Sequence, residues 1–123
     1  MEFHIRQGAT NPILKLRLIQ DGKNDKSSFN DMLESAKITF EMFDISTGEY
    51  EILNSTCDIA LRKKLYNNTT DEYYIIHHFN EIQTSKIGKF EGKVTVQFRD
   101  TDLNPTDKLI LPLKEKLFIN VIQ

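Results

Sequence analysis

The residues best suited to metal binding or acid–base chemistry are three histidines, two of which are adjacent. His77 and His78 lie in a segment of alternating apolar residues, which predicts a β-strand. Adjacent side chains of a strand point to opposite faces of the sheet, so the two rings cannot bind one metal ion together. His4 is far away in the sequence, and no matching carboxylate pattern accompanies it. We therefore expect one packed histidine, one solvent-facing histidine and no metal site.

A second candidate is the acidic segment from Asp100 to Asn104, which places oxygen-bearing side chains at alternate positions, as the start of a calcium loop does. The sixth position of such a loop is usually glycine, but here it is Pro105. The twelfth position, which supplies a bidentate carboxylate, is Leu111. The segment therefore fails as an EF-hand. We expect a solvated turn there, with weak calcium binding as the alternative.

The usual sequence patterns of a catalytic centre are missing. The sequence has no Gly-x-Ser-x-Gly elbow and no glycine-rich phosphate loop. Cys57, the only cysteine, allows neither an internal disulfide nor a thiolate cluster, and its place in an alternating segment predicts a small buried residue. Glu49 and Glu51 share one side of a predicted strand, but exposed strand faces carry such pairs routinely. We predict that the protein is not an enzyme and uses no cofactor.

Length and charge narrow the class of protein further. A chain of 123 residues, 39% hydrophobic and 28% charged, suits one soluble domain over residues 1–123. A net charge of −2, with scattered lysines and arginines, gives no reason to expect nucleic acid or an acidic membrane as a partner. The N-terminal residues do not resemble a signal peptide, and no apolar run approaches the roughly 20 residues that span a bilayer. We expect a protein made in a cytoplasm, with no small-molecule substrate.

The dominant hydrophobic period along the chain is two, the period of strands that bury one face. Ser46 to Gly48 predicts a tight turn between two strands, and only Ser28 to Ser35 looks helical. The sequence therefore predicts an all-β fold, an immunoglobulin-like antiparallel β-sandwich of seven to nine strands with one short helix. The expected strands cover residues 3–6, 14–18, 36–42, 49–53, 57–63, 73–79, 89–98, 109–111 and 117–121.

Several apolar side chains fall on strand faces that should meet water. A lone monomer would expose them, and contiguous exposed apolar surface usually marks an interface. The other explanation is that some of them lie under the short helix or inside a closed barrel. The residues concerned are Phe43, Tyr50, Tyr74, Ile76, Phe118 and Ile122.

The stretch from Phe3 to Lys15 resembles the opening of the N-terminal domain of phage upper-baseplate proteins, in which an I-x-Q-G/N-x-T-x-P-x-L pattern leads into the first strand. Similar immunoglobulin-like sandwiches occur among small virion proteins of tailed phages, including the crAss-like group. The resemblance covers nearly the whole chain, but the segment from Asp21 to Ser35 is longer than expected and large C-terminal receptor-binding or assembly regions are absent. The resemblance to these phage proteins also includes five later segments, namely Asp21-Gly22, Ala36 to Asp44, Thr47-Gly48, Gly88 to Gly92 and Leu117 to Val121.

This resemblance implies a structural component of a tailed-phage virion, in the capsid, neck, tail or baseplate. Its partners would be other virion proteins and copies of itself, and its location would be the virion after synthesis in the host cytoplasm. The alternative is a carbohydrate- or receptor-binding β-sandwich module. We predict that the short strand from Phe3 to Arg6 leaves its own sandwich and docks on a neighbouring chain, so that the domain folds without it. Terminal edge strands commonly pair with another chain in this way. The alternative is that Phe3 and Ile5 pack inside their own sandwich.

Overall fold

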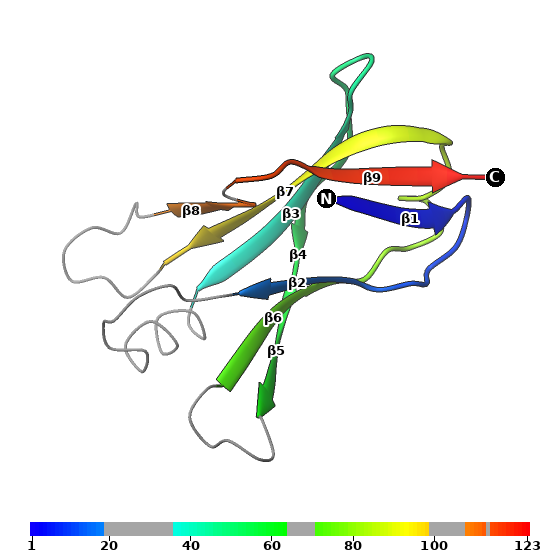
Figure 1. The fold of residues 1–123 in the computed structure, drawn as a ribbon. Coiled ribbons are helices and arrows are strands. Elements are labelled where there is room, and N and C mark those ends of the chain that lie inside the picture. The colour runs from blue at the N-terminus through cyan, green and yellow to red at the C-terminus, as the bar shows by residue number, and fades with distance from the viewer. Residues whose placement is uncertain (19–35, 64–70, 99–107, 113) are drawn as a thin grey trace.

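The computed structural model describes residues 1–18, 36–63, 71–98, 108–112 and 114–123. Within these ranges the regular structure consists of nine strands and contains no helix (Figure 1). The helix predicted at Ser28 to Ser35 and the calcium-like segment from Asp100 to Asn104 lie outside them. The strands are β1 (Glu2–Arg6), β2 (Leu14–Leu18), β3 (Lys37–Asp44), β4 (Tyr50–Thr56), β5 (Asp58–Lys63), β6 (Asp71–His77), β7 (Gly88–Gln97), β8 (Lys108–Leu111) and β9 (Leu117–Ile122).

The strands form two sheets that pack face to face as a β-sandwich. The large sheet has the order β1-β9-β7-β3-β4, with β8 also paired to β7, and the small sheet has the order β2-β6-β5. In the immunoglobulin fold, strands G, F, C and C′ share one sheet and strands B, E and D share the other. Strands β9, β7, β3 and β4 correspond to the first set, and β2, β6 and β5 to the second. The predicted fold class is confirmed.

The core lies between the sheets and follows the alternation seen in the sequence. Along β3 and β7 every second side chain is buried, so one face of each strand meets the small sheet. Phe40 at the centre of β3 is fully buried. A Cβ atom on Gly92 would lie 3.0 Å from the Phe40 ring, which explains why glycine occupies this inward position of β7. The other buried apolar residues include Leu14, Leu16, Ile38, Met42, Ile52, Ile75, Phe79, Phe90, Val94, Val96, Leu117, Ile119 and Val121.

Cys57 lies at the point where the chain passes from the large sheet to the small one. It is the single residue between β4 and β5, and its backbone N–H donates to the carbonyl oxygen of Ile38 at 2.9 Å. Its side chain is only 8% exposed, so the predicted burial is confirmed. Burial, with a smaller contribution from the charge of Asp58, raises the pKa of the Cys57 thiol to about 12.

We therefore expect thiol reagents to leave Cys57 unmodified in the native protein at pH 8. A buried thiol with a raised pKa supplies almost no thiolate, which is the reactive form. Labelling in urea should be at least about a hundredfold faster than labelling without it, because unfolding exposes the side chain and restores its ordinary pKa. Mass spectrometry after a timed pulse of iodoacetamide measures both rates. Rapid modification of the folded protein would contradict the core position.

One strand departs from the expected antiparallel pattern. Strand β1 pairs in parallel with β9, with Glu2 opposite Phe118 and Arg6 opposite Ile122. Parallel neighbours need a long connection, and here almost the whole chain separates the two strands. Ile5 is 1% exposed, and the Phe3 ring stacks on Phe79 with 5.7 Å between centroids. The prediction that this strand docks on a neighbouring chain is therefore wrong, because β1 pairs with β9 and packs inside its own sandwich.

The connection from β1 to β2 is fastened to the loop between β6 and β7. Gly8 donates its N–H to the carbonyl oxygen of Thr84 at 3.0 Å, and the Thr84 hydroxyl donates to the carbonyl oxygen of Ala9 at 2.9 Å. The Gln7 side chain donates to the carbonyl oxygen of Ser85 at 2.8 Å. Gly8 adopts a φ of 74°, which favours glycine. The Gln-Gly part of the N-terminal sequence pattern thus has a structural role in holding β1 in place.

Candidate binding surfaces

His77 is packed into the core and His78 faces solvent, as the strand alternation predicts. The His77 ring stacks on Phe40, 4.4 Å between centroids, and meets Phe79 edge-on at 4.6 Å. His77 Nε2 lies 3.2 Å from Gln83 Oε1, which as an acceptor assigns the proton to Nε2. Nδ1 is buried without a hydrogen-bond partner in the described part of the chain. Burial, with a smaller effect from nearby His78, lowers the His77 pKa to about 4, although the bond to Gln83 opposes this shift.

The side chains that could bind a metal ion do not converge in the parts of the chain that the structure describes. His78 Nε2 lies 3.5 Å from Asp58 Oδ2 on the neighbouring strand, and both side chains are exposed. No group of three or more His, Cys, Asp or Glu side chains is close enough together there to hold a metal ion. In the same residues, no helix has the length and apolar character needed to cross a membrane.

Two of the six outward apolar residues, Phe43 and Phe118, are covered by lysine side chains of their own sheet. The Lys89 ammonium lies 4.3 Å from the centroid of the Phe118 ring, and the Lys93 ammonium lies 5.5 Å from that of Phe43. Both rings are half-buried on the outer face of the large sheet. Lysine stems shield apolar surface while their charges remain in water. Among the described residues, the cover of these two rings therefore comes from lysines of the same sheet.

Ion pairs tie the same face together. Lys89 Nζ lies 3.2 Å from Glu2 on β1, and Glu91 on β7 lies 3.9 Å from Lys93 and 3.6 Å from Lys116. Exposed pairs of this kind contribute little to folding stability. They do pair the charged groups at the centre of this face with one another.

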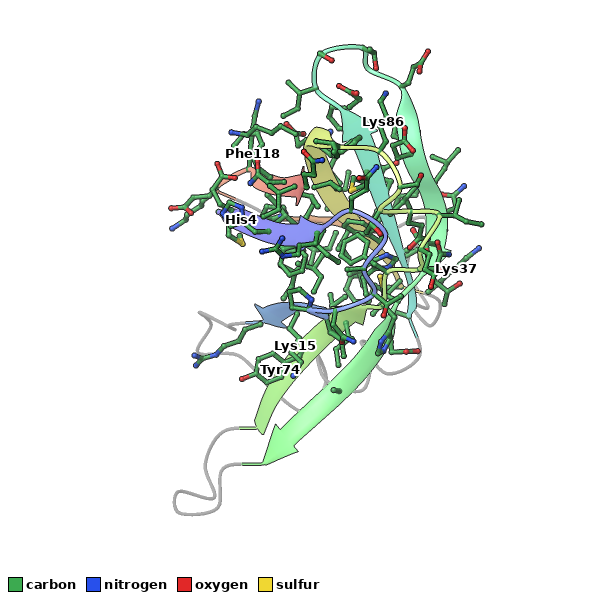
Figure 2. All side chains as sticks on the ribbon, turned by 90° about the vertical axis from the view of Figure 1, so that its right-hand side faces the viewer. His4, Lys15, Lys37, Tyr74, Lys86 and Phe118 are labelled. Carbon is green, nitrogen blue, oxygen red and sulfur yellow. The ribbon has the colours of Figure 1, made fainter. Side chains whose placement is uncertain are left out.

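The remaining four residues of the predicted apolar set differ in solvent exposure. Tyr74 and Ile76, on the outer face of β6, are half-buried, and Figure 2 shows Tyr74 on the small sheet, far from Phe118. Tyr50 and Ile122 are exposed. Of the six predicted positions, two are therefore exposed apolar residues, and one of these two, Tyr50, lies in the hairpin that joins β3 to β4.

The hairpin that joins β3 to β4 projects beyond the rest of the sandwich (Figure 1). We call residues 44–51 the β3–β4 projection. Ile45 within it is 46% exposed and Tyr50 is 53% exposed. Tyr50 lies beside Phe43, with 5.7 Å between ring centroids, so its ring is anchored on one side and open on the other. The carboxylate of Glu49 is also exposed.

Asp44 holds this projection in one conformation. One carboxylate oxygen accepts hydrogen bonds from the Ser46 N–H at 2.8 Å and from the Ser46 hydroxyl at 2.6 Å. Lys86 Nζ lies 3.1 Å from the other oxygen and 3.9 Å from Glu51, and Figure 2 shows Lys86 at the base of the projecting loop. The bonds from Ser46, followed by the contact with Lys86, lower the Asp44 pKa to about 2. The turn therefore stays charged and ordered at neutral pH.

A hollow of about 390 Å³ lies on the same sheet, where β8 and β9 meet along β7. Strand β9 pairs with the first half of β7 and β8 with the second half, so a gap opens between them near Lys93. We call this site the β8–β9 hollow. Its lining combines apolar and basic side chains and includes Lys93, Ile110, Leu111, Pro112, Lys114 and Lys116.

Sequence reasoning missed both of these surfaces. An apolar residue inside the turn Asp44-Ile45-Ser46 is an unusual choice, and this signal could have identified the projection. The hollow has no comparable signal, because Lys93 and Lys114 come together only through the pairing of β8 and β9 with one strand. The ion pair between Asp44 and Lys86 could not be predicted from the sequence either, because the two residues are far apart along the chain.

Comparison with known proteins adds no family assignment. No protein family model, curated protein or solved structure matches the chain significantly.

Proposed function

We propose that this protein is a structural component of a tailed-phage virion and acts through protein–protein contacts. The observation that carries the proposal is the β3–β4 projection, a rigid hairpin that presents Ile45 and Tyr50 to solvent. Exposed apolar groups on an ordered element favour a contact surface, because binding there costs little conformational entropy. Other virion proteins and copies of the same chain are the proposed partners, and the virion is the proposed location.

The N-terminal sequence pattern supports this proposal. Ile5 is buried, Gly8 adopts a positive φ and Leu14 belongs to the core, so the pattern that resembles the opening of upper-baseplate domains consists of residues that build this fold. The side chains best suited to catalysis or metal binding have structural roles instead. His77 and Cys57 are buried in the core. These uses favour binding by contact over catalysis.

A carbohydrate- or receptor-binding module is the second candidate. The exposed ring of Tyr50, next to Glu49 and half-exposed Glu51, offers one surface on which a sugar could stack. A single ring is a small platform, so this candidate has less support than assembly. A glycan array with the purified protein tests it directly, and strong selective binding would favour it.

Proteomics of purified phage particles tests the assembly proposal. We expect the protein to be present at a fixed copy number per particle. We also expect Ile45→Asp to reduce incorporation at least about tenfold, because a charge replaces an apolar contact group. Ile82→Asp is the matched control, since Ile82 is 80% exposed in a different loop. Both variants should melt like the wild type. Absence of the protein from purified particles would contradict the proposal.

A further inference from the structure

The β3–β4 projection and the β8–β9 hollow have complementary shapes. The projection stands out from the sandwich, whereas the hollow is concave and has a volume of about 390 Å³. This volume corresponds to about a dozen water molecules and accommodates one or two large side chains. Ile45 and Tyr50 are the large exposed side chains of the projection, and Ile110, 54% exposed, lies at the hollow.

The two surfaces also have opposite charge. The projection contains three carboxylates, on Asp44, Glu49 and Glu51, and within the described ranges Lys86 is the cation that pairs with two of them. Glu49 forms no direct ion pair with another described residue; its charge helps to raise the Lys86 pKa, and its exposed carboxylate can still contact a partner.

The hollow is lined by three lysines and two glutamates, and both glutamates already have partners. Glu91 contacts Lys93 and Lys116, and Glu115 lies 3.7 Å from the N-terminal ammonium group. Lys114 has no ion-pair partner within the described ranges. The unpaired charge in the hollow is therefore positive, and the unpaired charge on the projection is negative.

We propose that the β3–β4 projection of one copy inserts into the β8–β9 hollow of a second copy. This inference deepens the proposed function, on which it rests, because it identifies one partner as the same chain. Ile45 and Tyr50 would be buried against Ile110, Leu111 and Pro112, and Glu49 would pair with Lys114. Since the two surfaces differ, the contact is heterologous, and its repetition from copy to copy builds a ring or a filament from a single chain type.

The hydrogen bonds of Asp44 make the projection suitable for this role. The turn is ordered before binding, so little conformational freedom is lost when it enters the hollow. The apolar contacts give affinity, and the charges select the orientation. Association should therefore weaken as the salt concentration rises, because ions screen pairs at an interface rim.

Sedimentation velocity over a concentration series of the purified full chain tests the contact. We expect the wild type to self-associate, and Glu49→Lys and Lys114→Glu each to weaken association at least about tenfold, since each places like charges together. The double variant should associate like the wild type. An equimolar mixture of the two single variants should also associate, because each projection then meets a hollow of opposite charge.

Two control variants make the same charge reversals at exposed positions outside the projection and the hollow. Lys15→Glu on β2 and Glu81→Lys in the loop after β6 are exposed positions outside both surfaces, and these variants should associate like the wild type. A wild type that stays monomeric at every concentration would overturn the inference. Association of both single variants at wild-type strength, or failure of the double variant to recover, would overturn it as well. Particle proteomics separates the two proposals, since a monomeric protein found in virions retains the proposed function and loses only this contact.

Discussion

Deleting residues 1–6 is expected to lower the melting temperature by about 15–25 °C or to prevent folding. Ile5 is 1% exposed, Phe3 stacks on Phe79, and β1 covers the backbone of β9. Truncating one buried isoleucine costs about 2–5 kcal/mol, and a domain of this size has only about 5–15 kcal/mol of stability in total. Each kcal/mol corresponds to a few degrees in melting temperature, so the loss of the whole strand has a large effect. Circular dichroism during heating measures it.

Two single variants keep this prediction testable if the truncated protein does not fold. Ile5→Ala should destabilise the domain by about 2–5 kcal/mol in urea unfolding, because it leaves a cavity in the core. His4→Ala should have almost no effect, since His4 is exposed on the same strand. A truncated domain with the melting temperature of the wild type would contradict the structural role of β1 and revive the idea of an arm that docks on a neighbour.

Stability is expected to fall by about 3 kcal/mol as the pH drops from about 6.5 to about 4, because of His77. Burial lowers the pKa of this side chain from 6.5 to about 4 in the folded protein. Between these values the unfolded chain binds a proton that the folded chain does not, so acid favours unfolding. The stabilising contribution of neutral His77 is therefore present above about pH 6.5 and is lost as the pH falls from 6.5 to about 4. Below pH 4 both states are protonated, and the loss no longer grows.

Urea unfolding of the wild type and of His77→Phe at several pH values isolates this effect. Phenylalanine can stack on Phe40 as the imidazole does and cannot be protonated, so the variant should lack the wild-type dependence between pH 6.5 and 4. His78→Gln is the control and should retain it, since His78 is exposed. Glu2 and Asp44, whose pKa values are lowered from 4.5 and 3.8, lose their contributions as the pH falls below about 4.5. Because this loss occurs equally in the wild type and in His77→Phe, the difference between the two proteins still reports His77. Equal pH dependence in the wild type and His77→Phe would refute the assignment.

The burial or exposure of His77, His78 and Cys57 was predicted from the alternating sequence pattern. The opposite environments of His77 and His78 result from the alternation of side chains along a strand, which does not depend on the neighbouring strands. Cys57 is buried as predicted, although it lies between two strands rather than within one. Its backbone bond to Ile38 fixes it at the crossing between sheets, and this position depends on residues distant in the sequence.

The sequence by itself determined the all-β class, most of the strand positions and the inward face of each long strand, because a period of two specifies which side chains avoid water. Tertiary structure decided the features that join distant segments. The parallel pairing of β1 with β9 places Ile5 in the core, and the lysines of β7 cover Phe43 and Phe118. The projection and the hollow belong to this second group. Which side chains remain exposed, and which charges remain unpaired, depends on contacts between segments that no local pattern encodes.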